Sequence, residues 1–358
     1  MWKSLKDRAE GAKEMKRMKT TEAVGQVLCH DITQIIPGVT KDAIFRKGHI
    51  IREEDIPVLL SVGKESVYIW ENDETMMHEN DAAEILYRMT ANEHMHPSDV
   101  KEGKIEVIAD RDGLLKVDRE KLKKVNAFGE MMIATRHGNT VVKKGDKLAG
   151  TRIIPLVIKK EKMQEAEKIC AGIPILNILP FSVRKAAIIT TGNEVYHGRI
   201  KDAFTPVIEK KIAEFGAEMM FHEIFDDNDK KITDGCLRAI EAGADIVFCT
   251  GGMSVDPDDK TPLAIKNTGA EIISYGSPVL PGAMFLLSYY RKGDKIIPIC
   301  GLPGCAMYNK RTIFDLVLPR LMAEDLITAE ELASLGEGGL CLNCNVCTFP
   351  NCGFGKGW

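Results

Sequence analysis

Apolar positions follow their most regular pattern in the second half of the chain. The runs "KAAIITTG", "AEMMFHEIF" and "ADIVFCT" have the length and composition of buried strands. Between them, apolar residues recur every three or four positions from Phe204 to Phe215 and from Ile232 to Ile240, and each stretch stops near a glycine. The later runs "AEIISY", "MFLLSYY" and "KIIPIC", and the helix-like "NKRTIFDLVLPRLMAE", complete the domain. This order predicts an α/β domain over residues 184–325, with a doubly wound, mainly parallel sheet covered by helices on both faces.

The first half of the chain contains shorter elements. Residues 1–17 are charged and helix-prone, and we interpret them as an arm. Short β-rich runs and one amphipathic helix at residues 78–92 predict an α+β region over residues 18–102. Short β-type segments separated by turns predict a β-rich module and a connection to the next domain over residues 103–183. Residues 326–358 form a cysteine-rich tail.

Composition and charge narrow the class of protein. At 358 residues and 44% hydrophobic content, the chain is long enough for two or three domains with a core each. Its 48 basic and 52 acidic residues give a net charge of -4, so we expect binding to neither nucleic acid nor an anionic membrane. No apolar run is long enough to span a membrane, and the N-terminus lacks the apolar core of a signal peptide. We therefore expect a soluble, cytoplasmic protein. Any anion site must come from a local group of residues and not from the net charge of the chain.

Glycine-containing loops stand at the ends of the predicted strands. They read "TTGNEV", "TGGMSVDPDD", "PVLPGAMF" and "GLPGCAM". In an open α/β sheet, ligands bind beyond the carboxyl ends of the strands, where such loops gather. Gly251 and Gly252 let the backbone approach a ligand closely, and Ser254 can donate a hydrogen bond to it. The carboxylates that follow, Asp256, Asp258 and Asp259, can hold a divalent cation or accept from polar ring atoms. The alternative is a solvated turn in which Asp258 or Asp259 caps the next helix.

The last of these loops adds a possible anion site. Gly301, Pro303 and Gly304 lie between a predicted strand and a predicted helix. The free N–H groups of a helix N-terminus attract anions. Four such loops at one edge predict a pocket for an anionic, polar ligand.

The order of the four motifs resembles the molybdopterin-binding domain shared by molybdenum-cofactor biosynthesis proteins, among them the molybdopterin molybdotransferase and the molybdopterin adenylyltransferase. The resemblance covers residues 184–325. The N-terminal half is more loosely similar to the longer, multidomain members and lacks their serine-alanine-methionine-aspartate segment. Within the motifs, Asn193 replaces an aspartate, Asp256 a glycine, Ala283 a lysine and Cys305 an asparagine.

The resemblance also implies which residues bind the ligand. It places Glu194 and Asp259 at the centre of the chemistry, as ligands of a cation and of the pterin. Alanine at position 283 removes a charge that would stabilise a transfer step. The other positions that the resemblance assigns to ligand binding are Thr191, Gly192, Asn193, Gly251, Gly252, Ser254, Asp256, Pro281, Gly282, Gly301, Pro303 and Gly304.

Late assembly of the molybdenum cofactor is the function that the resemblance implies. Molybdate would be inserted into adenylylated molybdopterin with the help of magnesium, and AMP would leave. We expect molybdopterin or its adenylylated form and molybdate as ligands, and a homodimer. The alternative is a non-enzymatic carrier that delivers the cofactor to a molybdenum oxidoreductase, which Ala283 and the cysteine-rich tail favour. A third reading, a nucleotide hydrolase or deamidase like the competence-damage-inducible proteins, has only the shared fold behind it.

The tail "CLNCNVCTFPNC" has the spacing C-x2-C-x2-C-x4-C. Thiolates so close in sequence can converge on a zinc ion or on an iron–sulfur cluster, and the alternative is a flexible, redox-sensitive tail. We favour iron–sulfur and expect the centre to be independent of the pterin site, because the α/β core should end near Glu324. The predicted metal ligands are Cys341, Cys344, Cys347 and Cys352.

Two histidine–carboxylate pairs occur in the first half of the chain. They are His30 with Asp31 and His78 with Glu79. Such pairs can bind metal or transfer protons, but a surface hydrogen bond or a helix cap is the simpler interpretation.

Overall fold

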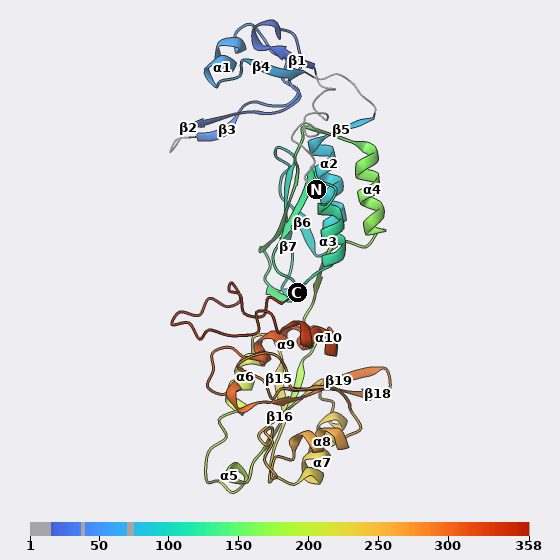
Figure 1. Ribbon diagram of the computed structural model, residues 1–358, viewed down its shortest axis with the longest axis vertical. Helices are drawn as coiled ribbons and strands as arrows, with labels where there is room; N and C mark the ends of the chain where they lie inside the picture. The colour runs from blue at the N-terminus through green and yellow to red at the C-terminus, as the bar shows by residue number, and fades with distance from the viewer. Residues whose placement is uncertain (1–15, 37–39, 70–74, 358) are drawn as a thin grey trace. The chain divides into compact units, whose positions relative to one another are not determined.

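The computed structural model describes residues 16–36, 40–69 and 75–357, and Figure 1 shows the elements along the chain. Residues 1–15 of the predicted arm lie outside the described residues, whereas Lys16–Lys19 form strand β1. Within the described part of the chain, no helix is both long enough and apolar enough to cross a membrane.

The chain divides into two compact units. The first unit comprises the described residues up to Arg111, with Val117–Arg136 and Lys143–Asn177. The second unit comprises Asp112–Lys116, His137–Val142 and the chain from Ile178 onward.

The N-terminal part of the first unit consists of two antiparallel strand pairs and a short helix. Strand β1 pairs with β4 (Ser66–Ile69), and β2 (Ile32–Ile36) pairs with β3 (Thr40–Phe45). The 3-10 turn η2 (Thr20–Glu22) follows β1, and helix α1 (Asp55–Ser61) precedes β4. These elements enclose a small core of their own. Its buried members are Ala23, Leu28, Ile32, Ile51, Leu59, Val67 and Ile69.

The rest of the first unit contains a four-stranded antiparallel sheet of order β6-β7-β11-β9 and a strand pair β12-β5. Helix α2 (Glu79–Thr90) confirms the predicted amphipathic helix, since Ala82, Leu86 and Met89 are buried. The pattern missed helix α3 (Arg119–Asn126), because only Val125 of this charged segment is buried. The other elements are β5 (Met76–His78), β6 (Met95–Pro97), β7 (Lys104–Ala109), β9 (Met131–Thr135), β11 (Lys147–Ile153), β12 (Val157–Lys159) and α4 (Lys160–Cys170).

The second unit confirms the predicted mainly parallel sheet. Its six strands have the order β15-β14-β16-β19-β18-β17. Strands β15, β14, β16 and β19 run parallel, whereas β18 and β17 are antiparallel to their neighbours. The bounds are β14 (Lys185–Thr191), β15 (Glu218–Phe225), β16 (Ile246–Thr250), β17 (Glu271–Tyr275), β18 (Leu286–Lys292) and β19 (Lys295–Leu302). A smaller sheet has the order β10 (Thr140–Val142), β8 (Gly113–Val117), β13 (Leu176–Leu179).

Helices cover both faces of the main sheet, as predicted. Successive residues of β14 point to opposite faces, so Ala186 and Ile188 join one apolar cluster while Ala187 and Ile189 join another. Helices α6 and α9 contribute to the first cluster, and α7 and α8 to the second. The helices are α5 (Asn193–Tyr196), α6 (Thr205–Ala213), α7 (Asp229–Glu241), α8 (Thr261–Asn267), α9 (Ile313–Met322) and α10 (Ala329–Ser334), with a 3-10 turn η3 (Gly304–Ala306).

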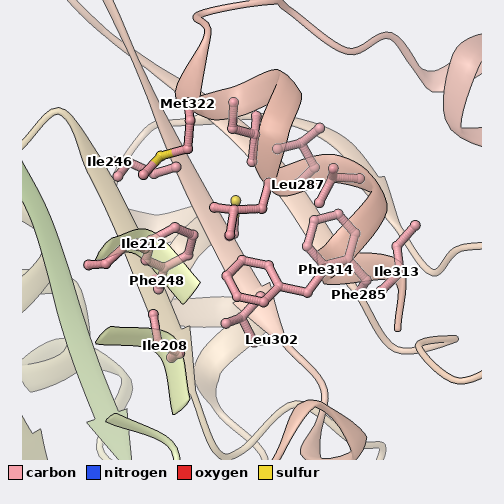
Figure 2. Packing of buried hydrophobic residues seen from close by; sticks show 14 of the residues in the cluster. Ile208, Ile212, Ile246, Phe248, Phe285, Leu287, Leu302, Ile313, Phe314 and Met322 are labelled. Carbon is pink, nitrogen blue, oxygen red and sulfur yellow. The ribbon is translucent and has the colours of Figure 1, made fainter. Parts of the chain in front are cut away.

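Figure 2 shows the first of these clusters, where α6 and α9 pack on the sheet. The rings of Phe248 and Phe314 meet edge to face, with their centroids 5.3 Å apart. Each fully buried aromatic ring of this kind stabilises the fold by about 2–3 kcal/mol through removal of apolar surface from water. The same cluster includes Ile327, Leu332 and Phe354, so the core of the second unit extends well beyond Glu324.

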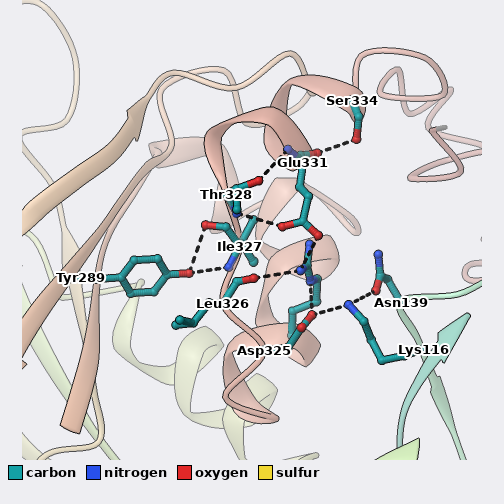
Figure 3. Close-up of polar contacts among 10 residues, drawn as sticks. Lys116, Asn139, Tyr289, Asp325, Leu326, Ile327, Thr328, Glu331 and Ser334 are labelled. Atoms are coloured by element: carbon teal, nitrogen blue, oxygen red, sulfur yellow. Dashed lines mark hydrogen bonds and ion pairs between the residues drawn. The ribbon is translucent and has the colours of Figure 1, made fainter. Parts of the chain in front are cut away.

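A buried arginine ties the end of α9 to the segment that follows it. Arg320 is 6% exposed; it donates to the Asp325 carboxylate and, 2.8 Å away, to Glu331 Oε1. Asp325 also accepts from Lys116 Nζ at 2.7 Å. Figure 3 shows this network beside Tyr289, whose hydroxyl accepts from the backbone N–H of Ile327 at 2.7 Å. Because buried charges are costly unless they are paired, the network fixes the path of the chain after α9.

Candidate functional site

The strand-end loops lie along one edge of the main sheet. Thr190 of β14 is level with Thr250 of β16, which is level with Leu302 of β19, so these parallel strands end together. Strand β18 runs the opposite way and begins at Leu286, opposite Gly301. The residues before β18 therefore emerge at the same edge as the loops that follow β14, β16 and β19. We call this edge, with its loops, the rim.

The double glycine after β16 is required by protein packing. Gly251 has a φ of +81°, and a methyl group there would overlap the carbonyl oxygen of Thr191. Gly252 has a φ of +55°, and a methyl group would lie 2.9 Å from Thr261 Oγ1. The Thr261 hydroxyl donates to the Gly251 carbonyl at 2.8 Å and lies 3.0 Å from Thr191 Oγ1. The turn is thus fastened to the neighbouring strand end and to α8.

The polar residues that follow this turn are largely open to solvent. Ser254 and Asp256 are exposed, and Asp259 is half-buried. The Asp256 backbone N–H donates to Asp259 Oδ2 at 3.1 Å, which closes a tight turn. The residue that caps α8 is Lys260, without a side-chain bond, so neither Asp258 nor Asp259 is the helix cap that the alternative interpretation required.

A carboxylate that the sequence analysis missed lies beside the predicted ones. Asp227, two residues after β15, accepts from the backbone N–H of Asn193 at 3.1 Å. Burial raises the pKa of Asp227, and the negative charges of Glu194, Asp258 and Asp259 raise it further. Asp227 follows a predicted strand like the other rim residues, and that position was the signal available in the sequence. Four carboxylates from three loops therefore share one electrostatic neighbourhood.

This neighbourhood is not a preformed metal site. Among the residues that the structure describes, no three histidine, cysteine, aspartate or glutamate side chains are close enough to hold an ion as they stand. Two oxygens near the rim also lack a hydrogen-bond partner, Thr250 Oγ1, whose residue is fully buried, and Asp226 Oδ1. Buried polar atoms of this kind are normally satisfied, so both can accept a bond from a bound molecule or from water.

Hydrogen bonds of Asp202 fix the segment between β14 and α6 to the end of β14. Asp202, in the "GRIKD" stretch, accepts from Thr190 Oγ1 at 2.9 Å and from Thr205 Oγ1 at 2.6 Å. His222 Nε2 lies 3.2 Å from both hydroxyls. Burial opposes ionisation of Asp202, but the hydrogen bonds from Thr205 and Thr190 outweigh it and lower the pKa of this carboxyl. Asp202 therefore holds the loop that carries Asn193 and Glu194 in place.

The glycines of the last two motifs differ in their surroundings. A methyl group on Gly282, at a φ of +134°, would overlap Ile313 at the start of α9, and one on Gly301 would overlap the Met253 side chain. Nothing lies within 4 Å of the corresponding position on Gly304. Tight packing against Ile313 explains glycine at position 282, whereas a side chain at position 301 would displace the flexible end of Met253, and Gly304 leaves its backbone accessible.

The helix predicted directly after Gly304 is wrong. The chain makes only the 3-10 turn η3 there, and α9 begins at Ile313. Thr312 and Asp315 form a capping box at the start of α9, so its first N–H groups are already partly occupied by the protein. The apolar periodicity of "NKRTIFDLVLPRLMAE" located α9 correctly, but the residues between Gly304 and Thr312 lack that periodicity.

The cysteine-rich tail packs against one rim motif and lies beside the segment that follows another. The backbone N–H of Leu280, just before Pro281, donates to the Gly339 carbonyl at 2.8 Å. The N–H of Cys341 donates to the Leu280 carbonyl, also at 2.8 Å. All four tail cysteines border one cavity of about 410 Å³, together with the 308–311 segment that follows η3.

Of the two histidine pairs, the one at His78 has a structural role. His78 is buried, its Nδ1 accepts from the backbone N–H of Asn80 at 3.1 Å, and it is the N-cap of α2. Its Nε2 lies 2.7 Å from the Cys29 carbonyl. The helix-cap interpretation is therefore confirmed for His78. His30 lies 3.8 Å from Cys29 Sγ through its Nδ1, and burial lowers the pKa of His30.

Comparison with known proteins assigns the second unit. Residues 187–323 match the family described as "Probable molybdopterin binding domain". The matched stretch includes every rim loop. Residues 187–323 form a molybdopterin-binding domain. Residues 17–71, in the first unit, match a domain family of unknown function.

Similar curated proteins are named competence-damage inducible proteins. One from Clostridium kluyveri is 28% identical over 156 residues, 38% of this chain and 37% of that protein. One from Bacillus velezensis is 32% identical over 85 residues, 24% of this chain and 20% of that protein. The chain thus spans well under half the length of each of these relatives.

Among solved structures, the tungsten cofactor synthesizing protein MoaB from Pyrococcus furiosus matches with 19% identity and a TM-score of 0.31, covering 40% of this chain and 89% of that one. The molybdopterin biosynthesis Mog protein from Mycobacterium ulcerans matches with 16% identity and a TM-score of 0.31, covering 42% of this chain and 99% of that one.

Proposed function

We propose that this chain binds molybdopterin, free or adenylylated, at the rim and inserts molybdate into the adenylylated form, as a molybdopterin molybdotransferase does. The observation that carries the proposal is the meeting of glycine-containing loops and four carboxylates at one edge of a molybdopterin-binding domain. A phosphate-bearing pterin suits such an edge, because backbone N–H groups hold its phosphates while carboxylates hold a cation or accept from ring N–H groups.

The proposed roles follow from position along the rim. Gly251, Gly252 and Gly304 offer backbone N–H groups to phosphate, with Ser254 as an added hydroxyl donor. Asn193 lies at the loop that Asp227 holds. The other assigned positions, Thr191, Gly192, Asp256, Pro281, Gly282, Gly301 and Pro303, shape the loops around the ligand.

Magnesium is the cation that we propose for this site. Glu194, Asp227 and Asp259 together would repel an anionic ligand, and the raised pKa of Asp227 reflects that accumulation of negative charge. A bound magnesium ion would neutralise the carboxylates and the phosphate oxygens together. Because the side chains are not gathered around a point, we expect the cation to bind with the ligand.

A second candidate function is a carrier that binds the finished cofactor and delivers it to a molybdenum enzyme. Ala283 favours this candidate, since it stands exposed at the rim where the transferase motif has a lysine. Without that positive charge, the rim keeps its binding groups but loses one that would stabilise charge during transfer.

Release of AMP tests the proposal. The full chain, incubated with adenylylated molybdopterin, magnesium and molybdate, should release AMP only when all three are present, and chelation of magnesium should stop the release. Asp227→Asn should slow release, whereas Asp294→Asn, in the exposed β18–β19 turn at the opposite end of β19, is the matched control. Tight pterin binding without AMP release would establish the carrier instead, and no pterin binding would overturn both candidates.

A further inference from the structure

The cysteine-rich tail is an ordered loop of the second unit. Besides its two backbone bonds to Leu280, the tail closes on itself, where the N–H of Gly355 donates to the Gly338 carbonyl at 3.0 Å. Phe354 is 5% exposed and belongs to the main apolar cluster of the sheet. A methyl group on Gly355 would overlap Leu316 of α9, so the tail is fitted closely to the helix beneath it. The structure thus argues against the flexible-tail alternative.

The tail and the loop after η3 enclose a cavity whose lining is unusual. All four of its thiols come from the tail, as Cys341, Cys344, Cys347 and Cys352. The remaining walls include the Phe349 and Phe354 rings and the cationic side chains of Lys310 and Arg311. Arg311 lies over the Phe349 ring, 4.8 Å from its centroid, and Lys310 Nζ donates to the Asn345 carbonyl at 3.3 Å.

The volume of the cavity and the distances between its thiols favour a cluster over a single metal ion. Four sulfurs that bind one zinc ion must each lie about 2.3 Å from one point. Among the residues that the structure describes, no three of these thiols are gathered around one point, so a single ion would bind only if the tail moved. The cavity of about 410 Å³ is also far larger than one ion or one water molecule needs, since a water molecule occupies about 30 Å³ in the liquid. In a four-iron cluster each thiolate binds a different iron, so the thiols need not converge.

The charges around the cavity also favour an iron–sulfur cluster. Four thiolates bring four negative charges, which an iron–sulfur cluster only partly neutralises. Lys310 and Arg311 provide positive charge at the wall, and Phe349 and Phe354 form part of the lining. Positive charge and hydrogen bonding near the sulfurs are among the means by which proteins hold such clusters.

We propose that the four tail cysteines bind a four-iron, four-sulfide cluster in this cavity. The cluster would lie beside the 308–311 segment that follows η3, and the tail that holds it is bonded to Leu280, next to Pro281 of the rim. This inference requires neither molybdotransferase activity nor pterin binding. The cluster proposal and the proposed function can therefore be disproved independently.

The experiment uses the full chain, purified without oxygen and reconstituted with ferrous iron and sulfide. We expect about four iron atoms and about four sulfides per chain, with broad visible absorption and a Mössbauer spectrum of a four-iron cluster. The double variant Cys344→Ser/Cys347→Ser should lose this absorption. Both residues are exposed, so the substitution removes ligands without removing packing. Cys305→Ser, a nearby thiol outside the cavity lining, is the matched control and should keep the cluster.

Circular dichroism of the double variant checks that the second unit still folds. One zinc per chain in place of iron would overturn the proposal, and so would protein that takes up no iron. Iron retained at the wild-type level in the folded double variant would overturn it equally.

Discussion

Gly251 and Gly304 both follow parallel strands at the rim, yet a methyl group would meet very different surroundings at the two positions. At Gly251 the backbone is left-handed and the carbonyl of Thr191 occupies the space. At Gly304 the backbone is ordinary and the space is open. The sequence presents both as glycines of one motif set, but only Gly251 is required by the fold itself.

We expect Gly251→Ala to lower the free energy of unfolding by about 2–4 kcal/mol, because the strand end must move away from Thr191 and the residue must keep a positive φ. Gly304→Ala, the matched control, should leave that free energy unchanged or raise it by up to about 1 kcal/mol. Urea unfolding of both variants measures the difference. Equal stabilities would mean that the turn can relax without cost.

A residue-scale prediction for pH concerns Glu79 at the start of α2. Burial raises the pKa of Glu79 to about 7, and Glu102 and Asp31 add to the shift while Arg152 opposes it. The folded state therefore holds a proton on Glu79 that the unfolded state has released above its ordinary pKa of 4.5. The stability from this group is present at low pH and is lost as the pH rises from that value toward 7.

Glu79→Gln should remove this slope, so that the variant gains stability relative to the wild type as the pH rises from 4.5 to about 7. These limits are the pKa values of Glu79 in the unfolded and the folded state. Urea unfolding across the window measures the effect, and Glu84→Gln at an exposed position of α2 is the control that should follow the wild type. Parallel profiles for wild type and Glu79→Gln would contradict the assignment.

At the scale of elements, α9 organises the second unit. Its start is fixed by the capping box and by Asp315, which pairs with Lys211 of α6 and with Arg311. Its end is fixed by Arg320, and the tail packs along its outer side. One helix thus connects the sheet core, the rim loop before it and the cysteine-rich tail.

Replacing Arg320 should therefore disturb more than one contact. We expect Arg320→Met to destabilise the chain by about 2–3 kcal/mol, because the buried carboxylate of Asp325 would keep only Lys116 as a partner. Arg291→Met, which removes an ion pair whose side chains are both about two-thirds exposed, should cost less than about 1 kcal/mol. Thermal and urea unfolding of the two variants measure how much stability each one loses. Equal losses would contradict a stabilising role of the Arg320 network.

At the scale of the whole molecule, the second unit extends beyond the domain that the family model matches. The molybdopterin-binding domain of residues 187–323 is completed by segments on either side of it in sequence. Lys116, from the earlier part of the chain, pairs with Asp325, and Phe354, from the tail, enters the core. The second unit is therefore larger than the stretch of residues that the family model matches.

The amino-acid sequence by itself determined the order of strands and helices in the second unit and the edge at which its loops gather. Both follow from local information, since apolar periodicity marks each element and parallel connections place strand ends on one side. The tertiary structure alone decided why Gly251 and Gly282 are glycines, because their neighbours Thr191 and Ile313 are distant in sequence. It also placed Asp227 among the rim carboxylates and packed the tail on α9. Such contacts join residues from separate segments, and no local pattern specifies them.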